Sequence, residues 1–149
     1  KLLYKANIEP STISAGTFVP ISLYELNNPE LLTEEFFGPI LHLIRYKSSE
    51  IDNVIDYINS TGYGLTFGVH SRIEQTVNYL CSKVNAGNCY VNRSIVGAVV
   101  GVQPFGGNNL SGTGPKAGGD NYLARLCTEK TISIDTTASG GNASLLCLD

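Results

Sequence analysis

The amino-acid sequence predicts an α/β fold, in which helices flank a largely parallel sheet. Short apolar runs typical of strands alternate with two segments whose apolar residues recur every three to four positions, as in amphipathic helices. The chain has 149 residues, of which 42% are hydrophobic and 15% charged, a balance typical of a globular domain with one core. We therefore expect ordered α/β structure over most of the chain.

The composition argues against several classes of function. The formal net charge is −3 and the Lys and Arg side chains do not cluster, so the sequence offers no basic surface for nucleic acid. No apolar run approaches the ~20 residues that cross a bilayer, and residues 1–10 lack the apolar core of a signal peptide. We therefore expect neither a membrane span nor export.

The first third of the chain predicts two strands joined by a turn. Residues 21–24 alternate weakly between polar and apolar, and the turn-forming sequence NNP follows them. A short helical turn through Leu32 comes next, and residues 40–46 form an apolar run typical of a strand. No strong element is expected before residue 21.

The middle of the chain predicts two helices that alternate with strands. Residues 48–58 have helical periodicity, with Ser48 or Ser49 as the candidate N-cap. The expected elements that follow are a buried strand at 65–70, a helix at 71–84 and a strand at 89–92. Strands that alternate with helices in this way favour parallel pairing.

A glycine-rich stretch, GAVVGVQPFGGNNLSGTGPKAGG at 97–119, predicts a loop that carries the functional site. It contains eight glycines, and Lys116 is its only charge. Such a segment cannot form a regular helix, but its backbone can approach a ligand closely when a scaffold holds it. Its glycine spacing matches neither the dinucleotide-binding pattern nor the P-loop pattern.

The C-terminal part predicts a strand and a tail. Residues 129–135 alternate between polar and apolar, which is typical of a sheet edge or of an arm that reaches a partner. Small residues and an apolar end follow. We expect residues 1–128 to form the main domain, 129–136 an arm strand and 137–149 a tail.

The residues alone do not identify a catalytic group. The turn EEFFGP at 34–39 can be a solvated pair of carboxylates, Glu34 and Glu35, beside two core aromatics, or it can be a binding turn. No Ser, Cys or Thr has an obvious base beside it in sequence. The four cysteines show no metal-ligand spacing, so we expect no metal site and buried free thiols.

Five short motifs nevertheless resemble, in order, the C-terminal part of aldehyde dehydrogenases. They are EFFGP at 35–39, YGL at 63–65, GNCYVN at 87–92, PFGG at 104–107 and SG at 111–112. Within that superfamily, the glycine-rich stretch and the tail TTASGGNASLL are most similar to the pyrroline-5-carboxylate (glutamate semialdehyde) dehydrogenase part of bacterial bifunctional proline utilisation proteins.

The resemblance implies a role for each matching residue. Glu35 would bind the nicotinamide ribose hydroxyls of NAD, and Phe37 would pack beside the nicotinamide ring. Phe105 would line the aldehyde pocket. Gly118 and Gly119 would hold the substrate carboxylate through their backbone amides, where a side chain would block close approach.

The resemblance also implies what lies elsewhere. The family's nucleophilic cysteine, general-base glutamate and main dinucleotide-binding domain would lie upstream, so residues 1–149 would be an inactive fragment of a cytoplasmic bacterial NAD-dependent enzyme. Residues 130–135 would connect copies of the enzyme in a homo-oligomer. FAD would be a cofactor only if an upstream proline dehydrogenase domain is present. A non-catalytic scaffold or binding module of the same fold, or a dehydrogenase for another aldehyde, are the alternatives.

Overall fold

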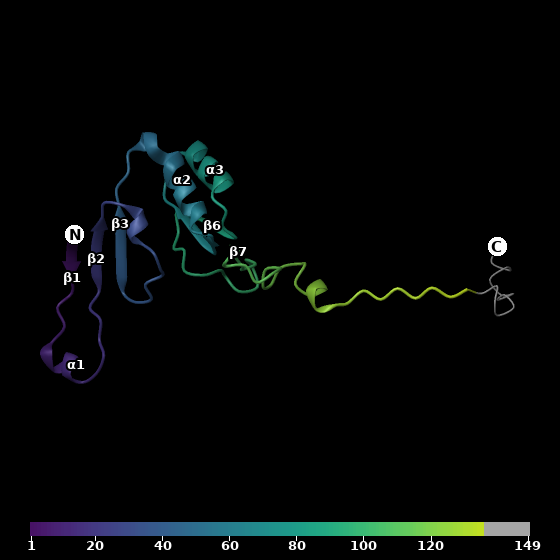
Figure 1. The fold of residues 1–149 in the computed structure, drawn as a ribbon, viewed down its shortest axis with the longest axis horizontal. Coiled ribbons are helices and arrows are strands. Elements are labelled where there is room, and N and C mark those ends of the chain that lie inside the picture. The colour runs from purple at the N-terminus through teal and green to yellow at the C-terminus, as the bar shows by residue number, and fades with distance from the viewer. Residues whose placement is uncertain (136–149) are drawn as a thin grey trace.

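Three small β-sheets and two ten-residue helices provide most of the regular structure in the computed structural model, which describes residues 1–135 (Figure 1). Parallel pairs join β2 to β3 and β5 to β6, and antiparallel pairs join β1 to β2 and β4 to β7. The α/β prediction is confirmed, but the strands lie in three separate small sheets, of which one is mixed, one antiparallel and one parallel. No helix in the described part is long and apolar enough to cross a membrane.

The first sheet contains three strands in the order β1 (Leu2–Lys5), β2 (Ser22–Leu26) and β3 (Ile40–Ile44). The strands predicted at 21–24 and 40–46 correspond to β2 and β3. β1 was not expected, because all four of its residues are exposed and its run is too short to show a periodicity. The short helix α1 (Pro10–Ser14) lies in the connection from β1 to β2.

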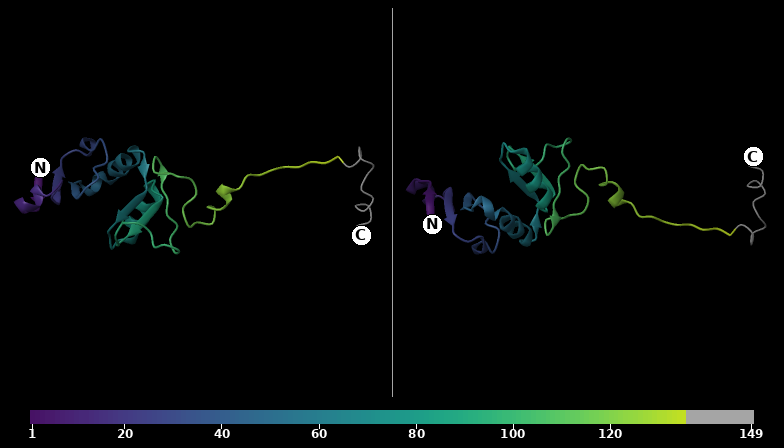
Figure 2. Two further views of the ribbon diagram at one scale, coloured as in Figure 1. Left: turned by 90° about the horizontal axis from the view of Figure 1, so that it is seen from below. Right: turned by 90° about the horizontal axis from the view of Figure 1, so that it is seen from above.

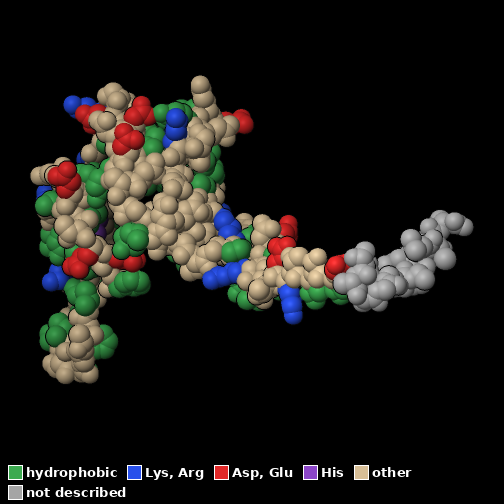
Figure 3. Space-filling view, turned by 45° about the vertical axis from the view of Figure 1, so that its right-hand side comes forward, with side chains coloured by type: hydrophobic (Ala, Val, Ile, Leu, Met, Phe, Trp, Pro, Cys, Tyr) green, Lys and Arg blue, Asp and Glu red, His purple; other side chains and the backbone are tan. Residues whose placement is uncertain are grey.

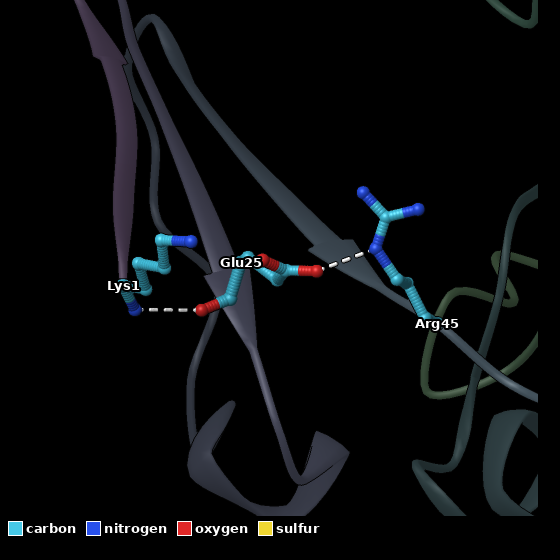
Figure 4. Close-up of polar contacts among 3 residues, drawn as sticks. All are labelled: Lys1, Glu25 and Arg45. Carbon is cyan, nitrogen blue, oxygen red and sulfur yellow. Dashed lines mark hydrogen bonds and ion pairs between the residues drawn. The ribbon is translucent and has the colours of Figure 1, made fainter.

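Glu25 links all three strands of this sheet (Figure 4). Its backbone oxygen accepts a hydrogen bond from the Lys1 nitrogen at 2.7 Å, and its carboxylate accepts one from Arg45 Nε at 2.5 Å. The Arg45 guanidinium lowers the pKa of the Glu25 carboxyl. Because Arg45 is 75% exposed, this ion pair adds little to stability and mainly fixes the ends of β2 and β3.

Two 3₁₀ turns, η1 (Pro29–Leu31) and η2 (Ser48–Glu50), precede the first long helix, α2 (Ile51–Ser60). The predicted N-cap at Ser48 or Ser49 is wrong. Both serines lie inside η2, which closes when Glu50 N–H donates to the Lys47 carbonyl at 2.8 Å and Lys47 N–H donates to the Glu50 carboxylate at 3.3 Å. α2 then begins after Glu50, whose carboxylate makes its bond within η2 and does not cap α2.

A strand–helix–strand unit follows, made of β5 (Thr66–Val69), α3 (Glu74–Lys83) and β6 (Asn88–Val91). β5 and β6 pair in parallel, as the alternation predicts. The helix begins later than expected, because Asn92 Oδ1 accepts the Ser71 N–H at 3.0 Å and holds the preceding residues in a turn. α2 packs against α3 here, and the main core consists of Ile55, Val69, Leu80 and Val84.

Backbone packing between glycines joins this unit to the glycine-rich stretch. We call Gly64, Gly87, Gly106 and Gly107 the glycine junction. A Cβ on Gly87 would overlap the Gly106 carbonyl oxygen, and one on Gly107 would lie 2.6 Å from the Ser111 oxygen. Gly87 N–H donates to the Gly64 oxygen at 2.9 Å. Side chains are therefore sterically excluded where these segments meet.

The short strands β4 (Tyr63–Gly64) and β7 (Asn108–Asn109) pair at the edge of the glycine junction. The Ser111 hydroxyl oxygen accepts the Gly64 N–H at 3.1 Å, which links the first residues after α2 to the glycine-rich stretch. A last 3₁₀ turn, η3 (Ala124–Leu126), ends the folded body.

The chain exposes far more surface than a closed globular protein of its size. Its accessible surface is 12001 Å², whereas a folded monomer of 16.0 kDa has about 7,400 Å². Hydrophobic side chains lie uncovered on the protruding α1 segment and on residues 123–134 (Figure 3). A surface of this kind is typical of a chain that packs against further polypeptide.

Residues 129–135 run away from the folded body as an extended segment (Figure 2). Residues 129–134 make no backbone hydrogen bond to the rest of the described chain, and Ile132 and Ile134 are 71% and 75% exposed. No strand is formed here within this chain, so pairing of the predicted arm with another chain stays a prediction. The predicted tail at 137–149 lies outside the described residues.

The cysteines in the described part are free thiols. Cys81 and Cys89 are half-buried, as expected, whereas Cys127 is exposed, which the sequence analysis predicted wrongly. The fourth cysteine lies outside the described residues. Cys127 directly follows η3, beyond which residues 129–135 run away from the folded body and do not cover it.

The glycine junction yields a stability prediction. Gly87→Ala should lower the free energy of unfolding by about 1–3 kcal/mol, because its methyl group would force Gly87 away from the Gly106 carbonyl. Gly16→Ala is the control, since its methyl group would meet only the exposed Phe18 ring, and it should change stability by less than about 0.5 kcal/mol. Urea unfolding followed by circular dichroism measures both. Equal effects would show that the junction tolerates a side chain.

Candidate functional site

The glycine-rich stretch forms a pocket of about 270 Å³. Its two walls are short extended segments, one containing Phe105 and the other Ala117, and the loop that precedes Pro104 closes a third side. Phe105 and Ala117 pair across these segments through two backbone hydrogen bonds of 3.0 and 2.9 Å. The lining residues carry no charge: Ala98, Val100, Gly101, Val102, Gln103, Phe105, Ala117 and Gly118.

Two of the predicted substrate-binding residues, Phe105 and Gly118, lie together in this pocket. Gly118 has a φ of +74°, and a Cβ there would have no atom within 4 Å. Among the described residues, no acceptor takes the Gly118 N–H. The pocket therefore combines an apolar ring with an open backbone donor, an arrangement that can hold an anionic group attached to an aliphatic chain.

Gly119, the third predicted substrate-binding residue, lies beside this pocket. Its N–H donates to the Lys116 carbonyl at 3.0 Å and so closes a turn. The amide that the turn leaves open is that of Gly118. A direct contact between Gly119 and a carboxylate stays a prediction, and the geometry favours Gly118 as the first donor.

A polar network shapes the loop side of the pocket. Arg93 stacks 4.5 Å from the centre of the Tyr90 ring and donates to Gln103 Oε1 at 3.0 Å. The same oxygen accepts the Val99 N–H at 3.1 Å. Sequence reasoning missed this network, although a lone Gln in an apolar loop next to Pro104 was a usable signal.

The one cation of the glycine-rich stretch does not face into the pocket. Lys116 Nζ donates to the Gly87 carbonyl and to Asn88 Oδ1, the latter at 3.3 Å. Its charge is thus directed towards the glycine junction. Gln103 and backbone groups are thus the polar groups of the pocket, and the placement of Lys116 brings in Asn88, which the sequence analysis had not singled out.

The predicted cofactor residues lie in a different region. Glu35 lines a second pocket of about 300 Å³ together with Tyr63, Gly64 and Ser111. Its side chain is exposed, and no described residue donates a hydrogen bond to it. Phe37 is 90% exposed, so the alternative that placed it in the core is wrong for this structure. The structure therefore does not bring Phe37 and Phe105 into one site.

Phe36, the neighbouring aromatic, is half covered instead. Its ring packs 5.3 Å from the His42 ring on β3, which is a tilted contact between ring centres. This contact holds the EFFGP turn against the first sheet. As a result, Glu35 is held next to an anchored residue although its own carboxylate is free.

The Cys89 thiol is poorly suited to act as a nucleophile. Burial raises the pKa of the Cys89 thiol, and the neighbouring Cys81 thiol raises it further, which disfavours the reactive thiolate. Residues 1–135 contain no group of three or more His, Cys, Asp and Glu side chains that could hold a metal ion.

Comparison with known proteins agrees with the motifs. A model of the aldehyde dehydrogenase family matches residues 3–132. Bifunctional protein PutA of Rhizobium meliloti is 56% identical over 122 residues, which make up 82% of this chain and 10% of that protein.

Solved structures show the same relationship. A variant of Bradyrhizobium japonicum proline utilization A (PutA) is 51% identical, with a TM-score of 0.81 over 94% of this chain and 14% of that chain. 1-Pyrroline-5-carboxylate dehydrogenase from Thermus, solved with bound NAD, is 38% identical, with a TM-score of 0.71 over 83% of this chain and 23% of that one. This chain thus spans less than a quarter of each of these relatives, and it belongs to the aldehyde dehydrogenase family.

Proposed function

We propose that residues 1–149 form the C-terminal part of an enzyme that oxidises glutamate semialdehyde to glutamate with NAD, in proline catabolism. The observation that supports this most directly is the uncharged pocket in which Phe105 lies beside the open Gly118 amide. The similarity to PutA and to 1-pyrroline-5-carboxylate dehydrogenase supports the same substrate. The reacting nucleophile and base would come from outside residues 1–149.

The pocket suits a substrate with a carboxylate at the end opposite its aldehyde. The Gly118 N–H would donate to that carboxylate, and a hydrogen bond to a charged group contributes about 1.5–3 kcal/mol. Phe105 would pack against the aliphatic carbons between the two ends. Fixing both features would hold the aldehyde carbon in place, which raises the rate as well as the affinity.

The exposed turn at Glu35 suits a dinucleotide. The Glu35 carboxylate has free acceptor oxygens for ribose hydroxyls, and the Phe37 ring has an open face for a flat heterocycle. NAD, when bound, would accept a hydride from the substrate. An FAD-dependent proline dehydrogenase activity would require a further domain and involves none of the residues discussed here.

Substrate discrimination tests the carboxylate assignment. In the complete enzyme, Gly118→Ala should lower kcat/KM for glutamate semialdehyde by about 10- to 100-fold, because the methyl group obstructs the amide and misplaces the aldehyde. Oxidation of a simple aliphatic aldehyde should change much less. Gly97→Ala is the matched control, since Gly97 has a similar φ of +70° and equally open surroundings but does not line the pocket.

Steady-state kinetics with both aldehydes measure these effects. The Gly97 variant should affect the two substrates equally, because it introduces only backbone strain. If Gly118→Ala also slows both equally, the pocket does not recognise a carboxylate and the proposed substrate is wrong.

A second variant tests the cofactor turn. Glu35→Gln should raise KM for NAD by about tenfold or more, because a charged acceptor is replaced by a neutral one. Glu34→Gln should have little effect, since Glu34 shares a neighbouring pocket with Glu35 and Tyr63 but does not line the one that contains Ser111. Unchanged KM and kcat in the Glu35 variant would remove this residue from the cofactor site.

We also propose that residues 130–135 pair with a sheet of a second copy in a homo-oligomer. The exposed Ile132 and Ile134 and the unpaired backbone of residues 129–134 support this proposal. Deletion of residues 129–149 from the complete enzyme should reduce its mass in light scattering. An unchanged mass would show that the arm does not hold the oligomer together.

A further inference from the structure

The Asn88 side chain connects β6 to the wall of the candidate substrate pocket. Its Nδ2 donates to the Pro104 carbonyl at 3.0 Å, and its Oδ1 accepts the Gly106 N–H at 3.3 Å. These two partners lie on either side of Phe105. One amide group on a regular strand therefore fixes the backbone both before and after a residue of the pocket.

Lys116 joins the same cluster from the opposite wall. Its ammonium donates to the Gly87 carbonyl and to Asn88 Oδ1, and the side chain is half-buried. Lys116 comes directly before Ala117, whose backbone pairs with Phe105. Its Cα would also lie 3.2 Å from a Cβ on Gly106, so the two walls are already in close contact at this point.

Without these side chains, few bonds would hold the two walls together. Phe105 and Ala117 share a single bridge of two backbone hydrogen bonds, and neither segment belongs to a longer strand. An isolated pair of this kind opens easily in solution. Asn88 and Lys116 tie both walls to β6, which packs in a parallel pair with β5.

We propose that Asn88 and Lys116 are positioning residues, which together form a polar clamp that fixes Phe105 and Gly118 relative to β6. The clamp does not touch the substrate: the Lys116 ammonium is bonded to the Gly87 carbonyl, and Asn88 is bonded to backbone groups behind the pocket wall. The effect of the clamp on a carboxylate substrate rests on the proposed function, whereas its effect on the position of the two walls does not.

The clamp accounts for a charged residue in an otherwise uncharged loop. A lysine that bound the substrate carboxylate directly would need its ammonium in the pocket, but here the ammonium lies among carbonyl oxygens. A half-buried ammonium needs such acceptors. The charge of Lys116 therefore holds the two walls in position, and the open Gly118 amide remains available to bind the ligand.

Two variants in the complete enzyme test the clamp. Asn88→Ala removes the amide, and Lys116→Met keeps the aliphatic stem while removing the charge. Asn108→Ala is the control, because Asn108 donates to Asn85 Oδ1 at 2.8 Å near the glycine junction but contacts neither wall. If Asn88→Ala does not fold, Lys116→Met carries the test alone.

The first measurement is amide hydrogen exchange of peptides that contain Phe105 and Ala117. Both clamp variants should speed exchange of these peptides by about tenfold or more, because the bridge opens more often, whereas Asn108→Ala should not. Unchanged exchange in both clamp variants would overturn the proposal. This readout needs no substrate, so it is independent of the proposed function.

The second measurement compares two aldehydes. Loss of the clamp should lower kcat/KM for glutamate semialdehyde by about 10-fold or more, with a fall in kcat as well as a rise in KM, and should affect a simple aliphatic aldehyde much less. An equal loss for both substrates would show a general structural role and overturn the positioning role. If the unmodified enzyme does not oxidise glutamate semialdehyde, the proposed function fails, and the exchange result still decides the clamp.

Discussion

The close approach of Gly87 to Gly106 is the constraint on which the candidate site depends. No side chain fits between these two backbones, so the turn before β6 and the glycine-rich stretch meet directly. Because of this contact, the Asn88 amide and the Lys116 ammonium can reach across from one segment to the other. The pocket walls are thus positioned by backbone packing first and by polar side chains second.

The same constraint explains why the site is lined mainly by backbone and apolar groups. A glycine-packed segment has few side chains to offer, so recognition depends on amides that are left open, and Gly118 provides one. The nearby Cys89 thiol is disfavoured as a nucleophile by burial. The proposed function therefore assigns ligand binding to this part of the fold and bond making to groups outside it.

The uncovered surface of the chain agrees with the proposal that the catalytic groups lie outside residues 1–149. In the described part of the chain, the core between α2, α3 and β5 contains few buried side chains, while much apolar surface is open. The relatives in the aldehyde dehydrogenase family are several times longer than the stretch that they share with this chain. Contacts with further polypeptide would cover that surface, and they would also complete a site of which residues 1–135 show only one side.

Much of the fold could be predicted from the sequence, because its helices and parallel strands have clear hydrophobic patterns. β1 could not, since its four exposed residues show no periodicity, and the start of α2 was misassigned because the serines expected to cap it lie inside the preceding 3₁₀ turn η2. The site was predicted from resemblance to a family, and the structure then placed Phe105 and Gly118 in one pocket.

Asn88 and Lys116 were not anticipated. Their contacts join residues 16 to 29 positions apart, and no local pattern encodes such a pairing. Glycines at 87 and 106 were visible in the sequence, but only the fold shows that they face each other. Long-range polar contacts of this kind can be identified only in the three-dimensional structure, whereas amphipathic periodicity can be identified in the sequence.

The most direct test of the account is a crystal structure of the complete enzyme with glutamate, the proposed product, bound. The account predicts a glutamate carboxylate oxygen within hydrogen-bond distance of the Gly118 nitrogen, with Phe105 against the aliphatic carbons and the Lys116 ammonium still on the Gly87 carbonyl. A carboxylate bound by the Lys116 ammonium, or a product bound away from Phe105 and Gly118, would contradict it.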